Sequence, residues 1–305
     1  MNQAAKVQEV KSEAKGPLVW LDMDQKALDD AYDQMVYAPN RDQVHKRNQF
    51  NSDRVRARLG QPKRIAYGPT PIEQLDLFAT TNPNAPINVF IHGGAWRQRE
   101  VRDYAFMAEM FVRSGAHWIG LDFTGVDKSN GDLLPMADQV RRGIAFVHKN
   151  AKSFGGDPNR LYLTSHSSGS HLGGCVVTHD WRKDNLPVDI LKGAVLLSGM
   201  YDLAPVRLSK RSSYVTFTDA MVEKLSGGRF IDDLHTPLIL ACGTCETPEF
   251  QRQSRDFVAA VQAAGKQAEL IVGAGYNHFE LLETLANPYG LTGRAMLKQM
   301  ALAGA

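Results

Sequence analysis

The sequence predicts an α/β fold with a mostly parallel central sheet, helices on both faces and a small cap insertion. From Ile87 onward, apolar runs rich in β-branched residues alternate with longer runs at helical spacing, which is typical of repeated strand and helix units. The chain of 305 residues is 43% hydrophobic and 22% charged, so it holds enough apolar material for one large core. Between Asp202 and His235 the alternation gives way to polar and basic residues, which predicts an insertion.

Residues 1–20 are expected to form a mobile N-terminal arm, and residues 21–305 a single domain. Met1 to Gly16 is polar and mixed in charge, without the apolar core that a secretory signal requires. Leu21 to Tyr37 carries apolar residues at helical spacing with Asp and Lys between them, which predicts a packed helix. The polar stretch that follows, through Gln61, predicts no element.

An opening hairpin is expected from strands at Arg64 to Tyr67 and Gln74 to Phe78, separated by Gly68, Pro69 and Pro71. Further strands are expected at Ile87 to Ile91, His117 to Phe123, Arg160 to Thr164, Lys192 to Leu197, Leu238 to Cys242 and Ala268 to Val272. Helices are expected at Tyr104 to Ser114, Leu134 to Phe154, Gly169 to His179, Glu249 to Ala264 and Leu291 to Leu302. The loops after parallel strands meet at one edge of the sheet, and ligands bind there in such folds.

The insertion at about residues 203–235 is expected to cap that edge of the sheet. It contains Arg207, Lys210 and Arg211, and a weak helical pattern from Phe217 to Leu225. The alternative is a surface excursion with no role in a site.

The charge balance and the cysteines exclude several classes of protein. Thirty-five basic and thirty-three acidic residues leave a net charge of +2, too little for a surface that follows nucleic-acid phosphates. No apolar run reaches the roughly 18 to 20 residues that span a bilayer. Cys175, Cys242 and Cys245 form neither a disulfide framework nor a metal site of known spacing. We therefore expect a soluble cytoplasmic protein without a metal or cofactor, and with no nucleic-acid or membrane partner.

A candidate nucleophile lies where the strand ending at Thr164 runs into small residues and then a helix. The segment Ser165-His166-Ser167-Ser168-Gly169 resembles the nucleophile elbow G-x-S-x-G, whose sharp turn presents a serine hydroxyl above the sheet. Gly169 meets the need for a small residue, and Ser165 replaces the first glycine with the smallest polar side chain. Taken alone, such a serine-rich segment is more often a helix N-cap. The neighbouring motifs favour Ser167 as a nucleophile.

A second motif, His92-Gly93-Gly94-Ala95-Trp96, directly follows the strand ending at Ile91. It matches the HGGG-type loop that donates backbone N–H groups to an oxyanion. Such a donor lowers an acyl-transfer barrier by about 3 kcal/mol. We assign the oxyanion donors to the amides of Gly94 and Ala95, with Ser168 as a third donor from the elbow. A simple tight turn is the alternative for this segment when it is seen alone.

The general base is expected on a loop near the C-terminus, because enzymes with this elbow carry the triad in the order Ser, Asp or Glu, then His. His278 lies after the last predicted strand, in Gly273-Ala274-Gly275-Tyr276-Asn277-His278. His235 also follows the serine, but it precedes a strand and would lie at the opposite end of the sheet.

The acid is expected after the strand at Leu238 to Cys242, where the sequence offers Glu246 and Glu249. Glu246 lies on the loop and is the residue we assign. Glu249, just after Pro248, suits the first turn of a helix, where the helix dipole favours acidic residues. Asp202 is a third candidate, since some members of this fold carry the acid one strand earlier.

Together these segments resemble the kynurenine formamidase (arylformamidase) branch of the α/β-hydrolase superfamily, which is related to hormone-sensitive-lipase-like esterases. The segments that carry the resemblance are residues 67–78, 92–97, 154–161, the elbow, 246–250 and 277–279. The resemblance implies the α/β-hydrolase fold, the triad Ser167, Glu246 and His278, and a small N-acyl or N-formyl aryl amide as substrate. The sequence departs from the family's pattern at Ser165, at Ala95 and at residues 122–127. Because these loops are expected to line the pocket, other small amides and esters remain possible substrates.

Aromatic and basic residues beside these motifs are candidates for the substrate pocket. Trp96, Phe123 and Tyr276 are expected as pocket walls, with core packing as the alternative. Arg97, or Arg207 in the insertion, is expected to bind a carboxylate if the substrate carries one.

Three functions remain open at this point. The first is a metal-independent serine hydrolase of small N-acyl or N-formyl amides. The second is a short-chain carboxylesterase, and the third is a non-catalytic ligand-binding protein on a hydrolase fold. A homodimer is common among such folds, and the sequence itself leaves the oligomeric state open.

Overall fold

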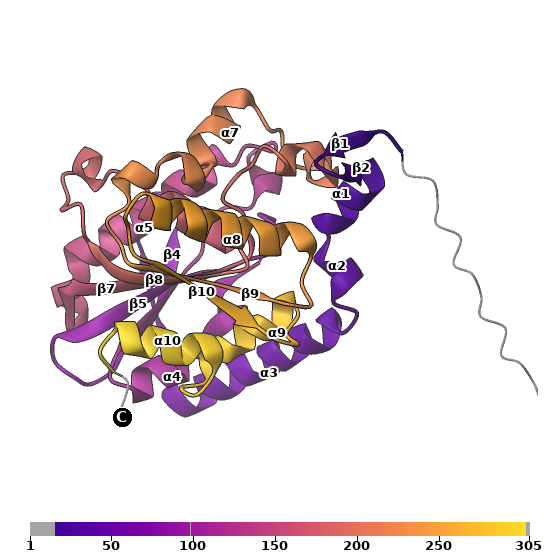
Figure 1. Ribbon diagram of the computed structural model, residues 1–305. Coiled ribbons are helices and arrows are strands. Elements are labelled where there is room, and N and C mark those ends of the chain that lie inside the picture. Colours follow the sequence, from indigo (N-terminus) through magenta and orange to yellow (C-terminus); the bar gives the residue numbers. More distant parts are fainter. Residues whose placement is uncertain (1–15, 98, 303–305) are drawn as a thin grey trace, which may run out of the picture.

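The computed structural model describes residues 16–97 and 99–302, which form an eight-stranded sheet covered by helices (Figure 1). The strand order is β10-β9-β8-β7-β5-β6-β4-β3. The strands are β3 (Lys63–Ala66), β4 (Gln74–Phe78), β5 (Ala85–Ile91), β6 (His117–Leu121), β7 (Gly156–His166), β8 (Leu191–Leu197), β9 (Leu238–Gly243) and β10 (Ala268–Gly273). Strands β5 to β10 pair in parallel, whereas β3 and β4 are antiparallel at one edge. The predicted fold class is confirmed, and the opening hairpin is present.

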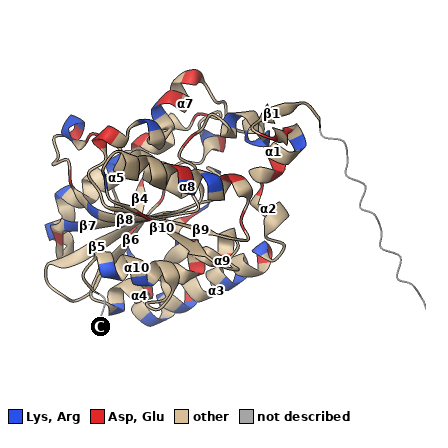
Figure 2. Cartoon of the chain, viewed as in Figure 1, with Lys and Arg blue, Asp and Glu red and all other residues tan. Residues whose placement is uncertain are grey.

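Two helical layers bury the two faces of the sheet. The main helices are α3 (Arg41–Leu59), α4 (Ala108–Arg113), α5 (Leu134–Asn150), α6 (Ser168–Val177), α8 (Pro248–Ala263), α9 (His278–Glu283) and α10 (Leu291–Gln299). One apolar cluster joins α5, α6 and α8 to the sheet, and a second joins α4, α9 and α10 to the opposite face. Because both faces are covered, every residue of β5, β6 and β9 is buried. Charged residues concentrate in the outer helices and loops (Figure 2).

The prediction of a single helix over Leu21 to Tyr37 is wrong. Residues 1–15 of the expected arm lie outside the described residues. A small hairpin of β1 (Leu18–Trp20) and β2 (Met23–Asp24) is followed by α1 (Gln25–Ala31) and α2 (Gln34–Tyr37). The interruption has a local cause, because the side chain of Asp33 accepts a hydrogen bond from the amide of Met35 and starts a new helix.

The 19-residue helix α3 lies in the polar stretch for which no element was predicted. Its buried face is a narrow stripe of Val44, Asn48, Ser52 and Val55, at spacings of four, four and three residues. Two of these four residues are polar, so apolar periodicity does not reveal the helix. The hydroxyl of Ser52 instead bonds the backbone of Asp103 and Phe106, which fastens α3 to the 3-10 helix Val101–Met107.

The insertion contains short 3-10 turns and α7 (Asp219–Leu225), close to the predicted weak helix. Helix α7 packs against α5 and α6. The turn at Lys210–Ser213 reaches α1, because the amide of Lys210 donates to the carboxylate of Asp29 over 2.6 Å. Among residues 16–302 that are described, no helix is long and apolar enough to cross a membrane.

Candidate active site

Ser167 lies at a strained turn between β7 and α6. Its φ of 60° and ψ of −127° are unusual for a residue with a side chain, and such a conformation costs about 1–3 kcal/mol. A Cβ atom at Gly169 would collide with the carbonyl oxygens of Ile91 and His92, which explains the need for glycine there. Ser165 is accommodated without a glycine, because its hydroxyl lies 2.9 Å from that of Ser170. The geometry is therefore that of a nucleophile elbow.

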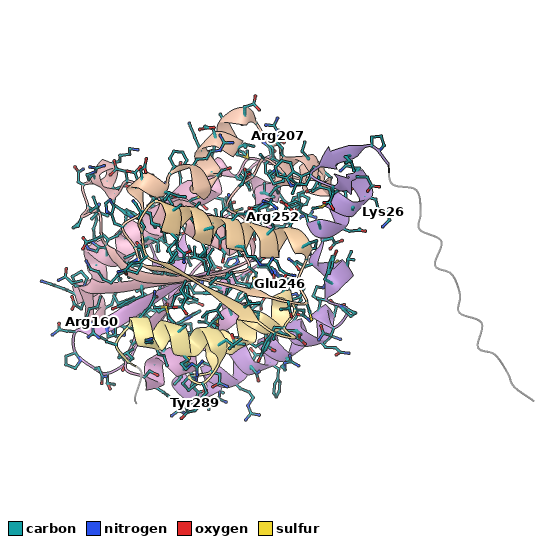
Figure 3. The ribbon with its side chains drawn as sticks, in the orientation of Figure 1. Lys26, Arg160, Arg207, Glu246, Arg252 and Tyr289 are labelled. Carbon is teal, nitrogen blue, oxygen red and sulfur yellow. The ribbon has the colours of Figure 1, made fainter. Side chains whose placement is uncertain are left out.

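His278 is buried at the first position of α9, and its Nδ1 lies 2.9 Å from Oε2 of Glu246. Glu246 is on the loop that follows β9 and is also buried. Figure 3 shows it in the interior, between α8 and α9. The structure thus brings together the histidine and the acid that were assigned from the sequence.

The two other candidate acids have different partners. Glu249 accepts a hydrogen bond of 2.8 Å from the hydroxyl of Tyr32 and forms an ion pair of 2.7 Å with Arg252. The carboxylate of Asp202 accepts from the amide of Ala204 over 2.9 Å. Neither of these carboxylates bonds His278 in the described part of the chain.

Two donors fix the orientation of the Glu246 carboxylate. The hydroxyl of Ser198 and the amide of Gly243 each donate to Oε1 over 2.6 Å, which leaves Oε2 for His278. Burial raises the pKa of Glu246 to about 7, and these two hydrogen bonds act in the opposite direction. Ser198 was not recognised from the sequence, because nothing marks a serine after a strand as the partner of a carboxylate 48 residues later.

His278 is electrically neutral near neutral pH. Its pKa is lowered to about 3, mainly by burial and additionally by the positive charge of Arg211 and by the nearby His45. With Nδ1–H donating to Glu246, the other ring nitrogen, Nε2, carries a lone pair and can accept a proton. A second histidine, His166, holds the backbone of His278, since its Nε2 donates to the His278 carbonyl over 2.9 Å.

The loop after β5 has an unusual backbone at Gly94, Ala95 and Trp96, with φ values of 123°, 55° and 61°. Its conformation is fixed by the elbow, because the amide of Trp96 donates to the hydroxyl of Ser168 over 3.0 Å. Within the described residues, no hydrogen-bond acceptor is found for the amides of Gly94, Ala95 and Ser168. These three predicted oxyanion donors therefore have no protein partner with which a substrate oxygen would compete.

Ser167 and His278 line the same cavity, of about 460 Å³. Gly94, Ala95 and Arg97 also line it, as does the insertion through Lys210, Arg211 and Tyr214. A further part of the wall comes from the N-terminal region, through Tyr32, Met35, His45 and Asn48. Sequence reasoning missed this N-terminal contribution, because α3 was not predicted and its four cavity residues therefore had no expected position.

Of the residues predicted to form the pocket, Arg97 lines the cavity and is paired with Asp127 over 3.0 Å. The prediction is wrong for the three aromatic residues. Trp96 is buried, and its indole N–H donates to Nδ1 of His171 over 3.0 Å. Phe123 stacks on His92 with ring centroids 4.3 Å apart. Tyr276 packs against the second apolar cluster.

The prediction for Arg207 is also corrected. Its guanidinium pairs with Asp219 over 2.6 Å, and Figure 3 shows it at the periphery near α7. It is not among the residues that line the cavity in the described structure.

A parallel sheet with a strained serine after β7, a carboxylate after β9 and a histidine after β10 defines a hydrolase of the α/β-hydrolase fold. The comparisons with known proteins agree. The BD-FAE family model matches residues 75–189. Carboxyl esterase 2 from Tuber melanosporum has the same fold, with a TM-score of 0.66 at 19% identity over 80% of this chain and 87% of that chain.

Within this class the chain is similar to the kynurenine formamidases, as the sequence motifs indicated. It is 28% identical over 243 residues to kynurenine formamidase from Danio rerio, covering 77% of this chain and 80% of the relative. It is also 29% identical over 241 residues to isoprenylcysteine alpha-carbonyl methylesterase ICME from Arabidopsis thaliana, covering 71% of this chain and 56% of that protein.

Proposed function

We propose that the protein is a serine hydrolase that cleaves a small aryl N-acyl or N-formyl amide through an acyl-enzyme intermediate. One observation carries the proposal: His278, whose Nδ1 lies 2.9 Å from Glu246, lines the same cavity as Ser167. The strained turn at Ser167 is joined to the predicted oxyanion loop, residues 92–96, by the hydrogen bond from the amide of Trp96 to the hydroxyl of Ser168. A carboxylate that orients a neutral imidazole beside a serine is the arrangement used in nucleophilic acyl transfer.

In the proposed reaction, His278 takes the proton of the Ser167 hydroxyl as the oxygen attacks the substrate carbonyl. Glu246 holds the imidazole in the required tautomer and stabilises the imidazolium that forms. The amides of Gly94, Ala95 and Ser168 donate to the oxyanion. His278 then gives its proton to the leaving amine, and water releases the acyl group from Ser167 by the same steps in reverse order.

The substrate class rests on the likeness to the kynurenine formamidase of Danio rerio and on the cavity. A volume of about 460 Å³ lies in the range of small-molecule sites, and the cavity is lined by both apolar and charged side chains. Phe279, Leu282 and Tyr104 supply apolar surface of the kind that an aryl ring would contact.

The test compares kcat/KM for N-formylkynurenine with kcat/KM for phenyl acetate. We expect substantial turnover of the amide. A large preference for the ester would favour the second candidate, a short-chain carboxylesterase, which the likeness to the methylesterase of Arabidopsis thaliana supports.

The mechanism is tested by S167A, with S153A, an exposed serine of the 3-10 turn Ala151–Phe154, as the control. S167A should lower kcat by roughly a thousandfold or more while unfolding at the same temperature as the wild type. It should also lose labelling by a fluorophosphonate probe. A wild-type chain that the probe does not label would instead indicate a non-catalytic ligand-binding protein.

A further inference from the structure

Arg211 is a buried cation at the cavity, and it forms no ion pair in the described part of the chain. The carboxylate of Asp33 attracts it only from beyond ion-pair distance and is itself paired with Lys210. The residue is 6% exposed and lines the same cavity as Ser167. One guanidinium nitrogen, Nη2, donates to the backbone carbonyl of Tyr32 over 2.9 Å, and Nη1 donates to the hydroxyl of Tyr214 over 3.0 Å. The buried Nε has no acceptor. None of these contacts neutralises the charge.

The surroundings of the guanidinium are aromatic. Its carbon lies 5.3 Å from the ring centroid of Trp96 and 5.8 Å from that of Phe250. Contacts with aromatic faces orient an arginine but replace only part of its lost hydration. An arginine stays protonated in proteins, so it cannot relieve its burial by losing the charge. The site therefore favours an anion that comes from outside the protein.

Most of the other charged residues of the cavity are already paired. Arg41 pairs with Asp42 over 2.7 Å, and Arg97 pairs with Asp127. Lys210 pairs with Asp33, which removes one of the two acidic side chains in the cavity wall.

Two charged residues of the wall, besides Arg211, form no ion pair in the described structure. Arg99 has only a contact of 3.5 Å with Nε2 of His45, and the second acid of the wall, Asp103, forms no ion pair either. The wall therefore carries a net excess of positive charge, and Arg211 is the buried part of it.

We propose that Arg211 is a subsite for an anionic group on the substrate, with a planar carboxylate as the group that its geometry suits best. The proposal rests on the proposed hydrolase function and specifies the substrate class of the same cavity. A guanidinium bonds carboxylates through parallel N–H donors. Of the donors of Arg211, the structure pairs one N–H of Nη1 and one of Nη2, and the buried Nε has no acceptor.

This subsite also acts on the reaction centre. The charge of Arg211 contributes to the lowered pKa of His278, after burial. A carboxylate bound at Arg211 offsets that charge and makes His278 a stronger base. An anionic substrate should therefore have a higher kcat as well as a lower KM than its neutral analogue.

The test uses esters that differ only in one carboxylate: phenyl acetate and the ortho, meta and para isomers of acetoxybenzoate. In the wild type, kcat/KM for at least one acetoxybenzoate should exceed that for phenyl acetate. R211Q should lower this preference by roughly tenfold to a hundredfold, the range expected for a hydrogen-bonded charge pair. R229Q removes an exposed arginine of the same insertion, which pairs with Glu223, and should leave the preference unchanged.

An equal loss of kcat/KM for all four esters in R211Q would show that Arg211 only maintains the structure, and it would overturn the proposal. So would a wild-type enzyme that prefers phenyl acetate to every acetoxybenzoate. R211K keeps the charge without the forked donors, and it should keep only part of the preference.

A binding measurement separates this proposal from the proposed function. Benzoate should raise the unfolding temperature of the wild type and of S167A more than benzamide does, and the difference should disappear in R211Q. If R211Q does not fold, the comparison of benzoate with benzamide on the wild type decides. Benzoate stabilisation without any hydrolysis would overturn the function and retain the subsite, whereas ester hydrolysis without a benzoate effect would overturn the subsite alone.

Discussion

At the scale of single residues, hydrogen-bond donors around Glu246 and His278 determine how the proposed catalytic groups are oriented. Ser198 and Gly243 hold one oxygen of Glu246, so the other oxygen faces His278. His166 fixes the histidine backbone. These are neutral partners that cost little to bury once they are bonded, and they leave the imidazole free to change its charge during the reaction.

The pH dependence of hydrolysis should report the environment of His278. Burial and the charge of Arg211 disfavour the imidazolium, so the pKa of His278 lies below its ordinary value of 6.5. The base is active when neutral. Glu246, whose pKa burial raises to about 7, must be ionised to hold the imidazole, and it titrates together with His278. For phenyl acetate, kcat/KM should therefore be nearly constant above about pH 8 and fall as the pH is lowered through about 7.

R211Q removes a positive charge that disfavours the imidazolium, so the acid limb of this profile should move to higher pH. The limb belongs to the hydrogen-bonded Glu246–His278 pair as a unit, and the direction of the shift is the informative quantity. The exposed variant R229Q should leave the limb in place. A profile that moves to lower pH in R211Q would contradict the electrostatic argument.

At the scale of elements, the start of α3 is hydrogen-bonded to the N-terminus of α9, where His278 is the first residue of the helix. Asn277 caps α9 and forms a capping box with Glu280. Asn40, at the start of α3, donates to Glu280 over 2.6 Å and accepts from Asn277 over 2.8 Å. The N-terminus of α9, and with it the backbone of His278, is thus bonded to a residue more than two hundred positions earlier in the chain.

N40A should lower the free energy of unfolding by about 1–3 kcal/mol, because Asn277 and Glu280 each lose a partly buried partner. It should also lower kcat more than it raises KM, since the position of His278 becomes less defined. Denaturant unfolding and steady-state kinetics measure the two effects. R47Q, which breaks the exposed Arg47–Glu283 pair between the same helices, is the matched control and should change both quantities less.

The same elements show what the sequence can predict. Strand β4 was predicted with its observed bounds because Gly68, Pro69 and Pro71 mark a turn before it. Strands β5 and β9 were predicted to within two residues at either end, because buried strands are mostly apolar runs bounded by turns. Ser167, Glu246 and His278 could be assigned because each follows a predicted strand and the order of the three is restricted. Helix α3 was missed because Asn48 and Ser52 occupy its buried stripe.

The other residues that line the cavity were less predictable than Ser167 and His278, because local sequence patterns do not determine their positions. Trp96 is the last residue of the predicted oxyanion loop, but its ring points towards His171, where the buried indole N–H finds an acceptor. The residues that do line the wall, such as His45 and Arg211, come from segments without strong periodicity. Their positions depend on tertiary contacts that no local pattern encodes.

At the scale of the whole molecule, the N-terminal region completes the cavity by packing on the insertion and on α8. Tyr32 connects the three parts. Its hydroxyl donates to Glu249 over 2.8 Å and accepts from Gln253 over 2.8 Å, and its carbonyl accepts from Arg211. Burial and the charge of Glu249 raise the pKa of Tyr32, so the phenol keeps its proton and remains a donor.

Y32F tests whether this connection stabilises the assembled cavity. The variant keeps the ring, but the buried carboxylate of Glu249 loses one donor and the amide of Gln253 loses an acceptor. The free energy of unfolding should fall by about 1–3 kcal/mol, measured by denaturant unfolding. Y289F removes the hydroxyl of a tyrosine that is 86% exposed, and it should unfold as the wild type does. Because Tyr32 also lines the cavity, KM should rise in Y32F and not in Y289F. If Y32F were as stable as Y289F with an unchanged KM, the N-terminal region would close the cavity through apolar contacts alone.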